Sequence, residues 1–271
     1  MEYKKLSNGV MVPMLGFGTW KIPSDIAEDV VADAIEVGYR HIDTAALYEN
    51  EEAVGRGIRR SGVKREELFV VTKLNHADHG YQNTKDAFET SLRKLGLDYV
   101  DLYLIHWPKP LNVESWRAIE EIYLSKKARA IGVSNFHIHH LEELIQQGQI
   151  VPMVNQVEFH PYLTQVQLRE YMKIHDIAFS SWSPLQRGKI FEIVELQEIA
   201  KKYQKTVAQI VIRYNIQCGH IVLPKTITKS RMEENFNVFD FTLTQEDMDS
   251  IHALNKQTRV GSDPDTVYAK K

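Results

Sequence analysis

The sequence predicts an α/β fold, a closed (β/α)8 TIM barrel, from three observations. Short apolar runs alternate with amphipathic segments of helical period along the chain of 271 residues, which is typical of a parallel sheet covered by helices. Eight such runs fit the usual barrel size of about 250 residues. The rival, an open dinucleotide-binding sheet, usually carries G-x-G-x-x-G after its first strand. Here Lys21 stands where the third glycine after Gly16 and Gly18 would be, which favours the barrel.

The predicted strands begin with an N-terminal hairpin at residues 3–12, because Asn8-Gly9 between alternating runs is a strong hairpin signal. A first inner strand follows at 14–18. A short apolar run of β-prone residues recurs seven more times, so the remaining inner strands are expected at 39–42, 68–72, 100–105, 129–133, 153–157, 178–182 and 220–223.

Helices are predicted wherever apolar positions recur at helical spacing after a capping residue. Ser24 is expected to cap the first, whose apolar face includes Ile26, Val30 and Ala34. The others are expected at 49–60, 82–95 (capped near Asn83), 114–126, 137–147, 164–175 (capped near Thr164), 190–203, 206–217, 229–236 and 245–254 (capped by Thr244). No linker interrupts this pattern, so we expect one barrel domain spanning 1–271, with extra helices near the C-terminal end.

The composition excludes several classes of protein. A net charge of −3 gives no electrostatic reason to bind nucleic acid or a membrane surface. The single cysteine, Cys218, cannot form an internal disulfide or a CxxC pair. The N-terminus lacks an apolar signal region, and no run approaches the roughly 18 apolar residues of a membrane span. We therefore expect a cytoplasmic protein with no nucleic-acid or membrane partner.

Ionisable residues follow three consecutive predicted strands. Asp43, Lys73 and His106 stand at the strand ends, and Tyr48 lies in the loop after the first of these strands. The C-terminal ends of barrel strands meet at one rim, where active sites lie. Any one of these residues alone would more often be structural. Four at one rim predict an active site.

The chemistry of this quartet favours reduction of a carbonyl group. A tyrosine has a pKa near ~10, too high for easy proton donation at neutral pH. An ammonium ~4 Å away contributes about 4 kcal/mol at an effective dielectric of 20, enough to lower that pKa by up to about three units. Asp43 would hold Lys73, His106 would orient a substrate oxygen, and Tyr48 would act as general acid. The run from Gly132 to Phe136 fails the G-x-S-x-G pattern, so a hydride from a cofactor is the natural nucleophile.

Eight motifs, spread over almost the whole chain, resemble those of the aldo-keto reductases. They are L-G-F-G-T-W (15–20), G-Y-R-H-I-D-T-A-A-L-Y (38–48), V-T-K-L (71–74), L-I-H-W-P (104–108), A-I-G-V-S-N-F (130–136), N-Q-V-E-F-H-P (155–161), S-W-S-P-L (181–185) and L-P-K-T (223–226). The chain is most similar to short bacterial members that resemble glyoxal, methylglyoxal and 2,5-diketo-D-gluconate reductases. The resemblance implies a barrel that binds NADPH/NADP+ across its rim, and it implies the catalytic set Asp43, Tyr48, Lys73 and His106.

The resemblance also implies a set of cofactor-binding residues. The nicotinamide amide would contact Ser134, Asn135 and Gln156, and its ring would stack on Trp182, where other members have tyrosine. Lys225 and Arg231 would hold the 2′-phosphate and favour NADPH, since cations near a helix N-terminus suit a phosphate. The remaining implied cofactor residues are Gly18, Thr19, Trp20, Ser183, Leu185, Gly188, Thr226, Ile227, Thr228, Glu234 and Asn235.

The substrate pocket implied by the resemblance is open and broad in specificity. Its mouth would be built by Trp20, Leu47, Tyr48, His106 and Trp107. Asn75 stands where family members commonly have tryptophan, so this wall would be smaller and more polar. The loop 109–112 and the tail after Arg259 are short. We expect a small-molecule carbonyl substrate and, from the size of family members, a monomer.

Two other functions fit parts of the same sequence. One is a regulatory or redox-sensing subunit that binds the cofactor with little turnover. The other is an aldolase that uses Lys73 as a Schiff base, although Asp43 should keep that amine protonated.

A histidine group is predicted to be structural. His137, His139 and His140 lie near a helix start, with two at adjacent positions, and His76 and His79 form a similar pair. No neighbouring carboxylate or cysteine in the sequence completes a metal site. We therefore expect no metal.

Overall fold

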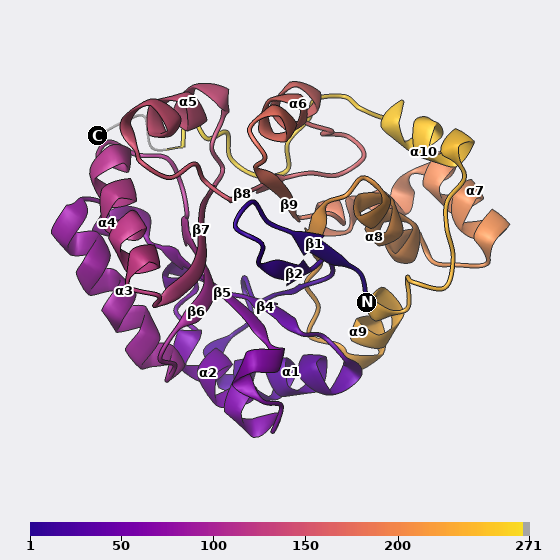
Figure 1. The fold of residues 1–271 in the computed structure, drawn as a ribbon. Helices are drawn as coiled ribbons and strands as arrows, with labels where there is room; N and C mark the ends of the chain where they lie inside the picture. Colours follow the sequence, from indigo (N-terminus) through magenta and orange to yellow (C-terminus); the bar gives the residue numbers. More distant parts are fainter. Residues whose placement is uncertain (268–271) are drawn as a thin grey trace.

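The structure, a computed structural model, describes residues 1–267 of the chain. Its centre is an eight-stranded sheet in which every hydrogen-bonded pair of strands is parallel and neighbours in space are neighbours in sequence (Figure 1). The strands are β3 (Phe17–Gly18), β4 (His41–Asp43), β5 (Phe69–Leu74), β6 (Val100–Ile105), β7 (Ala128–Ser134), β8 (Val154–Glu158), β9 (Ala178–Trp182) and β10 (Ile221–Leu223).

The barrel closes between its first and last strands. Leu15 forms a parallel bridge with Val222. The Gly16 amide donates to the Val222 carbonyl at 2.9 Å, and the Val222 amide donates to the Met14 carbonyl at 2.7 Å. The stretch 14–18 therefore performs the role predicted for the first inner strand, although only its last two residues have full strand pairing. The predicted (β/α)8 barrel is confirmed.

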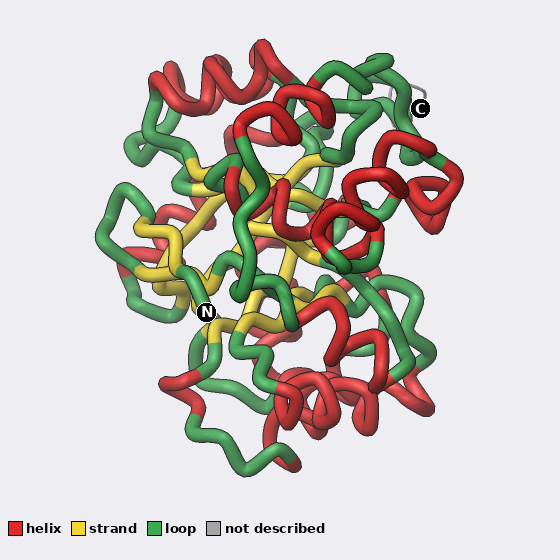
Figure 2. The backbone as a smooth tube through the Cα atoms, turned by 90° about the vertical axis from the view of Figure 1, so that its right-hand side faces the viewer, coloured by secondary structure: helices red, strands yellow, loops and turns green. Residues whose placement is uncertain are grey.

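Helices form the outer layer of the barrel (Figures 1 and 2). They are α1 (Ser24–Val37), α2 (Glu51–Arg60), α3 (Tyr81–Leu95), α4 (Asn112–Leu124), α5 (Ile138–Gln147), α6 (Val166–Ile174), α7 (Val194–Tyr203), α8 (Val207–Gln217), α9 (Lys229–Phe236) and α10 (Gln245–His252). Most of them come after a strand of the barrel, whereas α8 follows α7 and α10 follows α9; buried aliphatic and aromatic side chains on their inner faces fill a continuous core.

The N-terminal hairpin is confirmed. β1 (Tyr3–Lys5) pairs antiparallel with β2 (Met11–Pro13), and the hairpin lies across the end of the barrel that faces the viewer in Figure 1. The Asn8 amide donates to the Arg129 carbonyl at 2.9 Å. The hairpin thus covers the end opposite the C-terminal strand ends.

Three predicted helix caps are wrong, and one is confirmed. The Ser24 hydroxyl donates to the Glu49 carbonyl at 2.8 Å, and Pro23 takes the N-cap position of α1. α3 begins after Gly80, earlier than predicted, so Asn83 lies inside its first turn. α6 begins after Gln165, whose left-handed backbone replaces Thr164 as the cap. Thr244 does cap α10, because its hydroxyl accepts from the Asp247 amide.

The segment 190–203 is not one helix. A 3-10 element, η4 (Gln186–Glu192), precedes α7, and Arg187 and Gly188 inside it have φ of 55° and 99°. The break between this element and α7 is Ile193, whose extended backbone (φ −84°, ψ 112°) cannot continue a helix, so α7 starts only at Val194. β5 also extends further than predicted, which places Lys73 inside the strand rather than after it.

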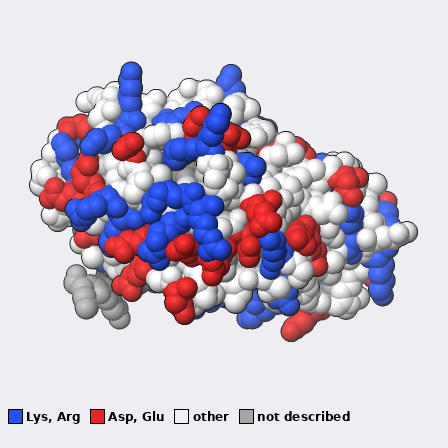
Figure 3. All heavy atoms as spheres, turned by 90° about the horizontal axis from the view of Figure 1, so that it is seen from below, with Lys and Arg blue, Asp and Glu red and all other residues white. Residues whose placement is uncertain are grey.

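On the face shown in Figure 3, cationic and anionic side chains intermingle, so neither sign of charge predominates on that face. Among residues 1–267, no helix is both long and apolar enough to cross a bilayer.

Candidate active site

The four rim residues predicted from the sequence lie together. Asp43 ends β4, Lys73 lies on β5, Tyr48 ends the 3-10 turn η1 (Ala46–Tyr48), and His106 directly follows β6. The Lys73 ammonium is 2.6 Å from Asp43 Oδ1 and 3.4 Å from the Tyr48 hydroxyl. The Tyr48 and His106 rings meet edge to face at a centroid distance of 5.5 Å.

Lys73 is fully buried, and its ammonium donates to three oxygens: Asp43 Oδ1, the Thr44 carbonyl at 2.8 Å and the Tyr48 hydroxyl. Burial lowers the pKa of Lys73, and contact with Asp43 opposes that shift. Three acceptors match the three protons of an ammonium, so no lone pair faces the cavity. This geometry disfavours a Schiff-base role for Lys73.

The predicted lowering of the Tyr48 pKa is wrong. Burial raises the pKa of Tyr48 well above its usual value, and the Asp43 carboxylate raises it further. The Lys73 ammonium by itself would lower this pKa, but desolvation of the buried phenol disfavours the charged phenolate and outweighs it. The phenol therefore keeps its proton at neutral pH.

His106 is neutral at physiological pH. Burial lowers its pKa well below the usual value, and the Lys73 charge lowers it further. Within the described residues, His106 Nδ1 is buried without a hydrogen-bond partner. A neutral imidazole on the cavity wall can orient an uncharged oxygen by hydrogen bonding.

Amide side chains connect this quartet to the next strands. Gln156, on β8, donates to Asp43 Oδ2 at 2.8 Å, so both oxygens of that carboxylate are occupied. Asn135, which follows β7 with φ of 64°, donates to the His106 carbonyl at 2.9 Å and accepts from the Trp182 indole at 2.8 Å. Asn135 thus fixes the end of β6 and the orientation of Trp182 together.

A cavity of about 1060 Å³ opens at this rim. It exceeds the usual range of about 300–1,000 Å³ for small-molecule sites. Most of the predicted site residues line it: Gly18, Trp20, Asp43, Leu47, Tyr48, His106, Trp107, Ser134, Asn135, Gln156, Trp182, Ser183, Leu185, Gly188, Lys225, Thr226, Arg231, Glu234 and Asn235.

Four predicted site residues do not line the cavity: Thr19, Lys73, Ile227 and Thr228. Thr19 is fully buried, and its hydroxyl donates to the Asp43 carbonyl at 3.0 Å. Thr19 therefore stabilises the rim through this hydrogen bond without lining the cavity. Asn75 is also absent from the wall. Its side chain caps a short turn by accepting from the Ala77 amide.

Sequence reasoning missed two cations at the cavity. Lys21 and Arg187 both lie against the Trp20 ring, with their charged groups 4.6 and 5.2 Å from its centroid, and both line the cavity. No local signal identified Arg187, because the left-handed turn that aims it follows from tertiary packing. Thr206, Val207 and Ala208 also line the cavity. The sequence does carry a signal here, because the T-x-x-Q capping box at Thr206 and Gln209 marks a helix N-terminus.

The C-terminal segment also reaches the cavity, although its shortness suggested an open pocket. Gly261, Ser262 and Val267 line the wall. A Cβ on Gly261 would clash with the Trp182 indole, so only glycine allows this approach. The amides of Val260 and Gly261 donate to the buried Glu158 carboxylate at 2.5 and 3.1 Å.

Contrary to the expectation from the sequence, a carboxylate does accompany His137, His139 and His140. The same C-terminal segment brings Asp265 to these histidines. The sequence could not show this, because over 120 residues separate the helix start from the tail.

The fold and the site define the class of protein as a (β/α)8 barrel with a group of buried ionisable side chains beside a large cavity at the C-terminal rim. The chain belongs to the aldo/keto reductase family, whose model matches residues 14–256.

Two curated relatives are similar over nearly their full length. Glyoxal reductase of Bacillus subtilis is 53% identical over 96% of this chain and 95% of its own. Methylglyoxal reductase DkgA of Escherichia coli is 44% identical over 96% of both chains. Among solved structures, the Gox0644 D53A mutant in complex with NADPH has a TM-score of 0.95 and 41% identity, covering 98% of each chain. These similarities confirm the family predicted from the motifs.

Proposed function

We propose that this protein is an NADPH-dependent carbonyl reductase that converts aldehydes, α-dicarbonyls and ketones to alcohols, with Tyr48 as the general acid. One observation carries the proposal. The Lys73 ammonium donates to the Tyr48 hydroxyl at 3.4 Å, so that oxygen acts as an acceptor toward Lys73 and its own proton is left for a partner in the cavity.

The cavity wall suits NADPH by the chemistry of its donors. Amide and hydroxyl groups of Ser134, Asn135 and Gln156 lie beside the quartet, with the Trp182 indole next to them. The cations Lys225 and Arg231 lie on the wall after β10. When bound, the cofactor would supply a hydride to the carbonyl carbon. A relative's structure in complex with NADPH supports the assignment.

The chain's own residues would handle the oxygen of the substrate. Tyr48 and neutral His106 would both hydrogen-bond the carbonyl oxygen and fix its position. As that oxygen gains negative charge it becomes a far stronger base than a phenolate, so it takes the Tyr48 proton despite the raised pKa of the phenol. The Lys73 ammonium would then stabilise the phenolate that remains.

The cationic end of the cavity would hold the adenosine phosphate. Lys225 is followed by α9, whose N-terminus offers backbone amides. Arg231 is exposed on the first turn of that helix, ready to pair with an anion. Lys21 and Arg187, both against the Trp20 ring, would meet the bridging phosphates.

Small reactive carbonyls are the proposed substrates, in line with the names of the glyoxal and methylglyoxal reductases. Trp20, Leu47 and Trp107 give the substrate end an apolar wall. We also propose one domain, a monomeric state and a cytoplasmic location, to which the free Cys218 is suited.

Replacing Tyr48 by phenylalanine tests the proposal. The Y48F variant should lose about 10²- to 10⁴-fold in kcat for methylglyoxal, the usual size of a general-acid effect. Its Kd for NADPH, measured by fluorescence titration, should change less than about threefold.

Tyr171→Phe, a matched change on α6 outside the cavity, should retain full activity. Wild-type turnover by Tyr48→Phe would remove Tyr48 as the proton donor. Loss of NADPH binding in that variant would instead give Tyr48 a binding role.

A further inference from the structure

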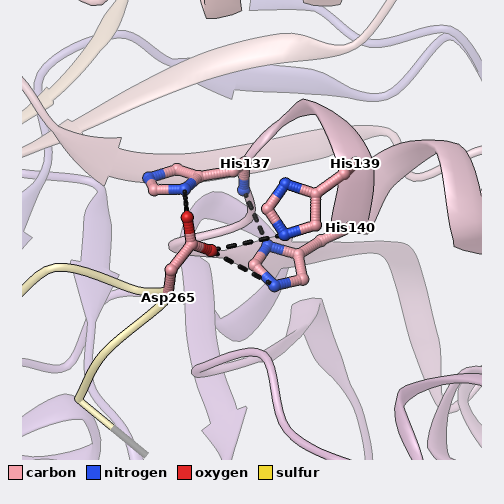
Figure 4. Close-up of side chains that lie close together, drawn as sticks. All are labelled: His137, His139, His140 and Asp265. Atoms are coloured by element: carbon pink, nitrogen blue, oxygen red, sulfur yellow. Dashed lines mark hydrogen bonds and ion pairs between the residues drawn. The ribbon is translucent and has the colours of Figure 1, made fainter. Parts of the chain in front are cut away.

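Three imidazoles and one carboxylate converge outside the proposed active site (Figure 4). His137 precedes α5, and His139 and His140 lie in its first turn. Asp265 comes from the C-terminal segment, on the other side of the group. One ligand-capable atom from each residue lies within 4.8 Å of all the others.

The separations of these atoms suit a bound metal ion. His137 Nδ1 is 3.0 Å from Asp265 Oδ2, and His139 Nε2 is 3.3 Å from Asp265 Oδ1. Zinc bonds of about 2.0–2.1 Å to nitrogen and 2.0–2.2 Å to oxygen, in tetrahedral geometry, put adjacent ligand atoms about 3.3 Å apart. An ion could therefore enter with only small shifts of these side chains.

His140 has a different role. Its Nδ1 accepts a hydrogen bond from the His137 backbone amide at 3.1 Å, so in the neutral ring the proton is on Nε2. That protonated nitrogen faces Asp265 Oδ1 at 3.7 Å. At that distance the His140 ring lies beside the carboxylate without a hydrogen bond to it, and because its Nδ1 is occupied by the His137 amide we count three ligands for the ion.

Arg259 must move when His137 binds an ion. Its guanidinium donates to His137 Nε2 at 3.0 Å, whereas a ring that coordinates through Nδ1 carries its proton on Nε2. The Arg259 guanidinium also lies near two carboxylates, 3.5 Å from that of Asp263 and 3.9 Å from that of Glu158. It can turn to either of them without losing an ionic partner.

The group is accessible to ions from solution. The His139 and Asp265 side chains are 61% and 47% exposed. A second cavity, of about 480 Å³, is lined by His139, His140 and Asp265, together with the acidic residues Glu114 and Glu143.

We propose that His137, His139 and Asp265 bind one divalent transition-metal ion of the zinc type, with a fourth position open to water. Two imidazoles and a carboxylate are ligands that such ions accept. The ion would join the start of α5 to the C-terminal segment. Because Gly261, Ser262 and Val267 of that segment line the large cavity, metal binding would also hold one wall of the proposed active site.

Titration of the full-length, tag-free protein with Co²⁺ and with Zn²⁺ tests this site. Co²⁺ should produce visible absorption bands that reach their full intensity at one equivalent of metal. Zn²⁺ should then displace the Co²⁺ and remove these bands. Asp265→Asn and His139→Ala should each weaken Zn²⁺ binding at least tenfold by calorimetry. His175→Ala, a histidine at the end of α6, is the control and should bind as the wild type does.

A second readout follows the C-terminal segment itself. Zn²⁺ should slow amide hydrogen exchange over residues 259–267 in the wild type and leave Asp265→Asn unchanged. Absence of binding at millimolar metal, or equal binding by Asp265→Asn, would overturn the site. Since neither readout depends on turnover, the result is independent of the proposed reductase activity.

Discussion

At the residue scale, hydrogen bonds decide which groups of the site carry protons. The Lys73 ammonium donates three hydrogen bonds, to Asp43, Thr44 and Tyr48. Gln156 occupies the second oxygen of Asp43. The buried pair is therefore fully satisfied, and removing one partner would leave an uncompensated charge, which typically costs about 3–5 kcal/mol. The same bonds leave the Tyr48 hydroxyl proton uninvolved in the contact with Lys73, as the proposed general-acid role requires.

Arg231 offers a test of cofactor preference at this scale. Arg231→Ala should raise KM for NADPH about tenfold or more, since a charge-assisted bond to phosphate is lost, and should leave KM for NADH nearly unchanged. Initial rates with both cofactors measure this. The control is Lys229→Ala on the same helix, because Lys229 pairs with Asp33 and Glu36 and does not line the cavity. Equal losses with NADPH and NADH would contradict a role at the 2′-phosphate.

At the element scale, the end of β8 holds the C-terminal segment. Burial alone would raise the pKa of Glu158, but hydrogen bonds from His160 and from the Val260 and Gly261 amides outweigh burial and lower it. The carboxylate is thus charged, and it accepts hydrogen bonds from two backbone amides of the C-terminal segment, which forms no strand there. One buried side chain substitutes for sheet pairing in that part of the wall.

Glu158→Gln should loosen this wall. Hydrogen bonds to a charged group contribute roughly 1.5–3 kcal/mol, so we expect a loss of about 2 kcal/mol in unfolding free energy and a several-fold higher KM for substrate. Urea unfolding and steady-state rates measure the two effects. Glu170→Gln, exposed on α6, should change neither. A variant with normal KM would show that the segment is held by other contacts.

At the scale of the whole molecule, buried neutral histidines make the fold sensitive to acid. Burial lowers the pKa of His41, His106 and His220, and burial with the nearby Lys109 charge lowers the pKa of His79 to about 4. An unfolded histidine binds a proton near pH 6.5. Since the unfolded chain binds more protons than the folded one below that pH, stability falls as the pH falls from about 6.5 toward 4.

Unfolding free energy measured by urea at several pH values should therefore be level from pH 8 to 7 and decline below about 6.5. His79 alone accounts for up to about 3 kcal/mol, from 1.36 kcal/mol per pKa unit. His79→Gln should flatten the decline by a comparable amount, and His175→Gln should not. Stability that stays constant down to pH 4.5 would contradict this explanation.

The barrel and the residues of its rim could be predicted from the amino-acid sequence alone. The strands at 100–105 and 178–182 and the helix at 229–236 were predicted at their observed bounds, because short continuous apolar runs mark buried strands and apolar residues at helical spacing mark helices. Asp43, Tyr48, Lys73 and His106 were predicted to meet because the ends of adjacent parallel strands are neighbours in any barrel.

The electrostatics of the site and the long-range contacts depend on how the chain packs. The pKa of Tyr48 depends on how much desolvation opposes the Lys73 charge, and burial is a property of the packed molecule. Arg187 reaches the cavity through a left-handed turn, and Asp265 reaches His137 across more than 120 residues. Local periodicity carries no record of such distances, so these features exist only once the barrel has brought its distant segments together.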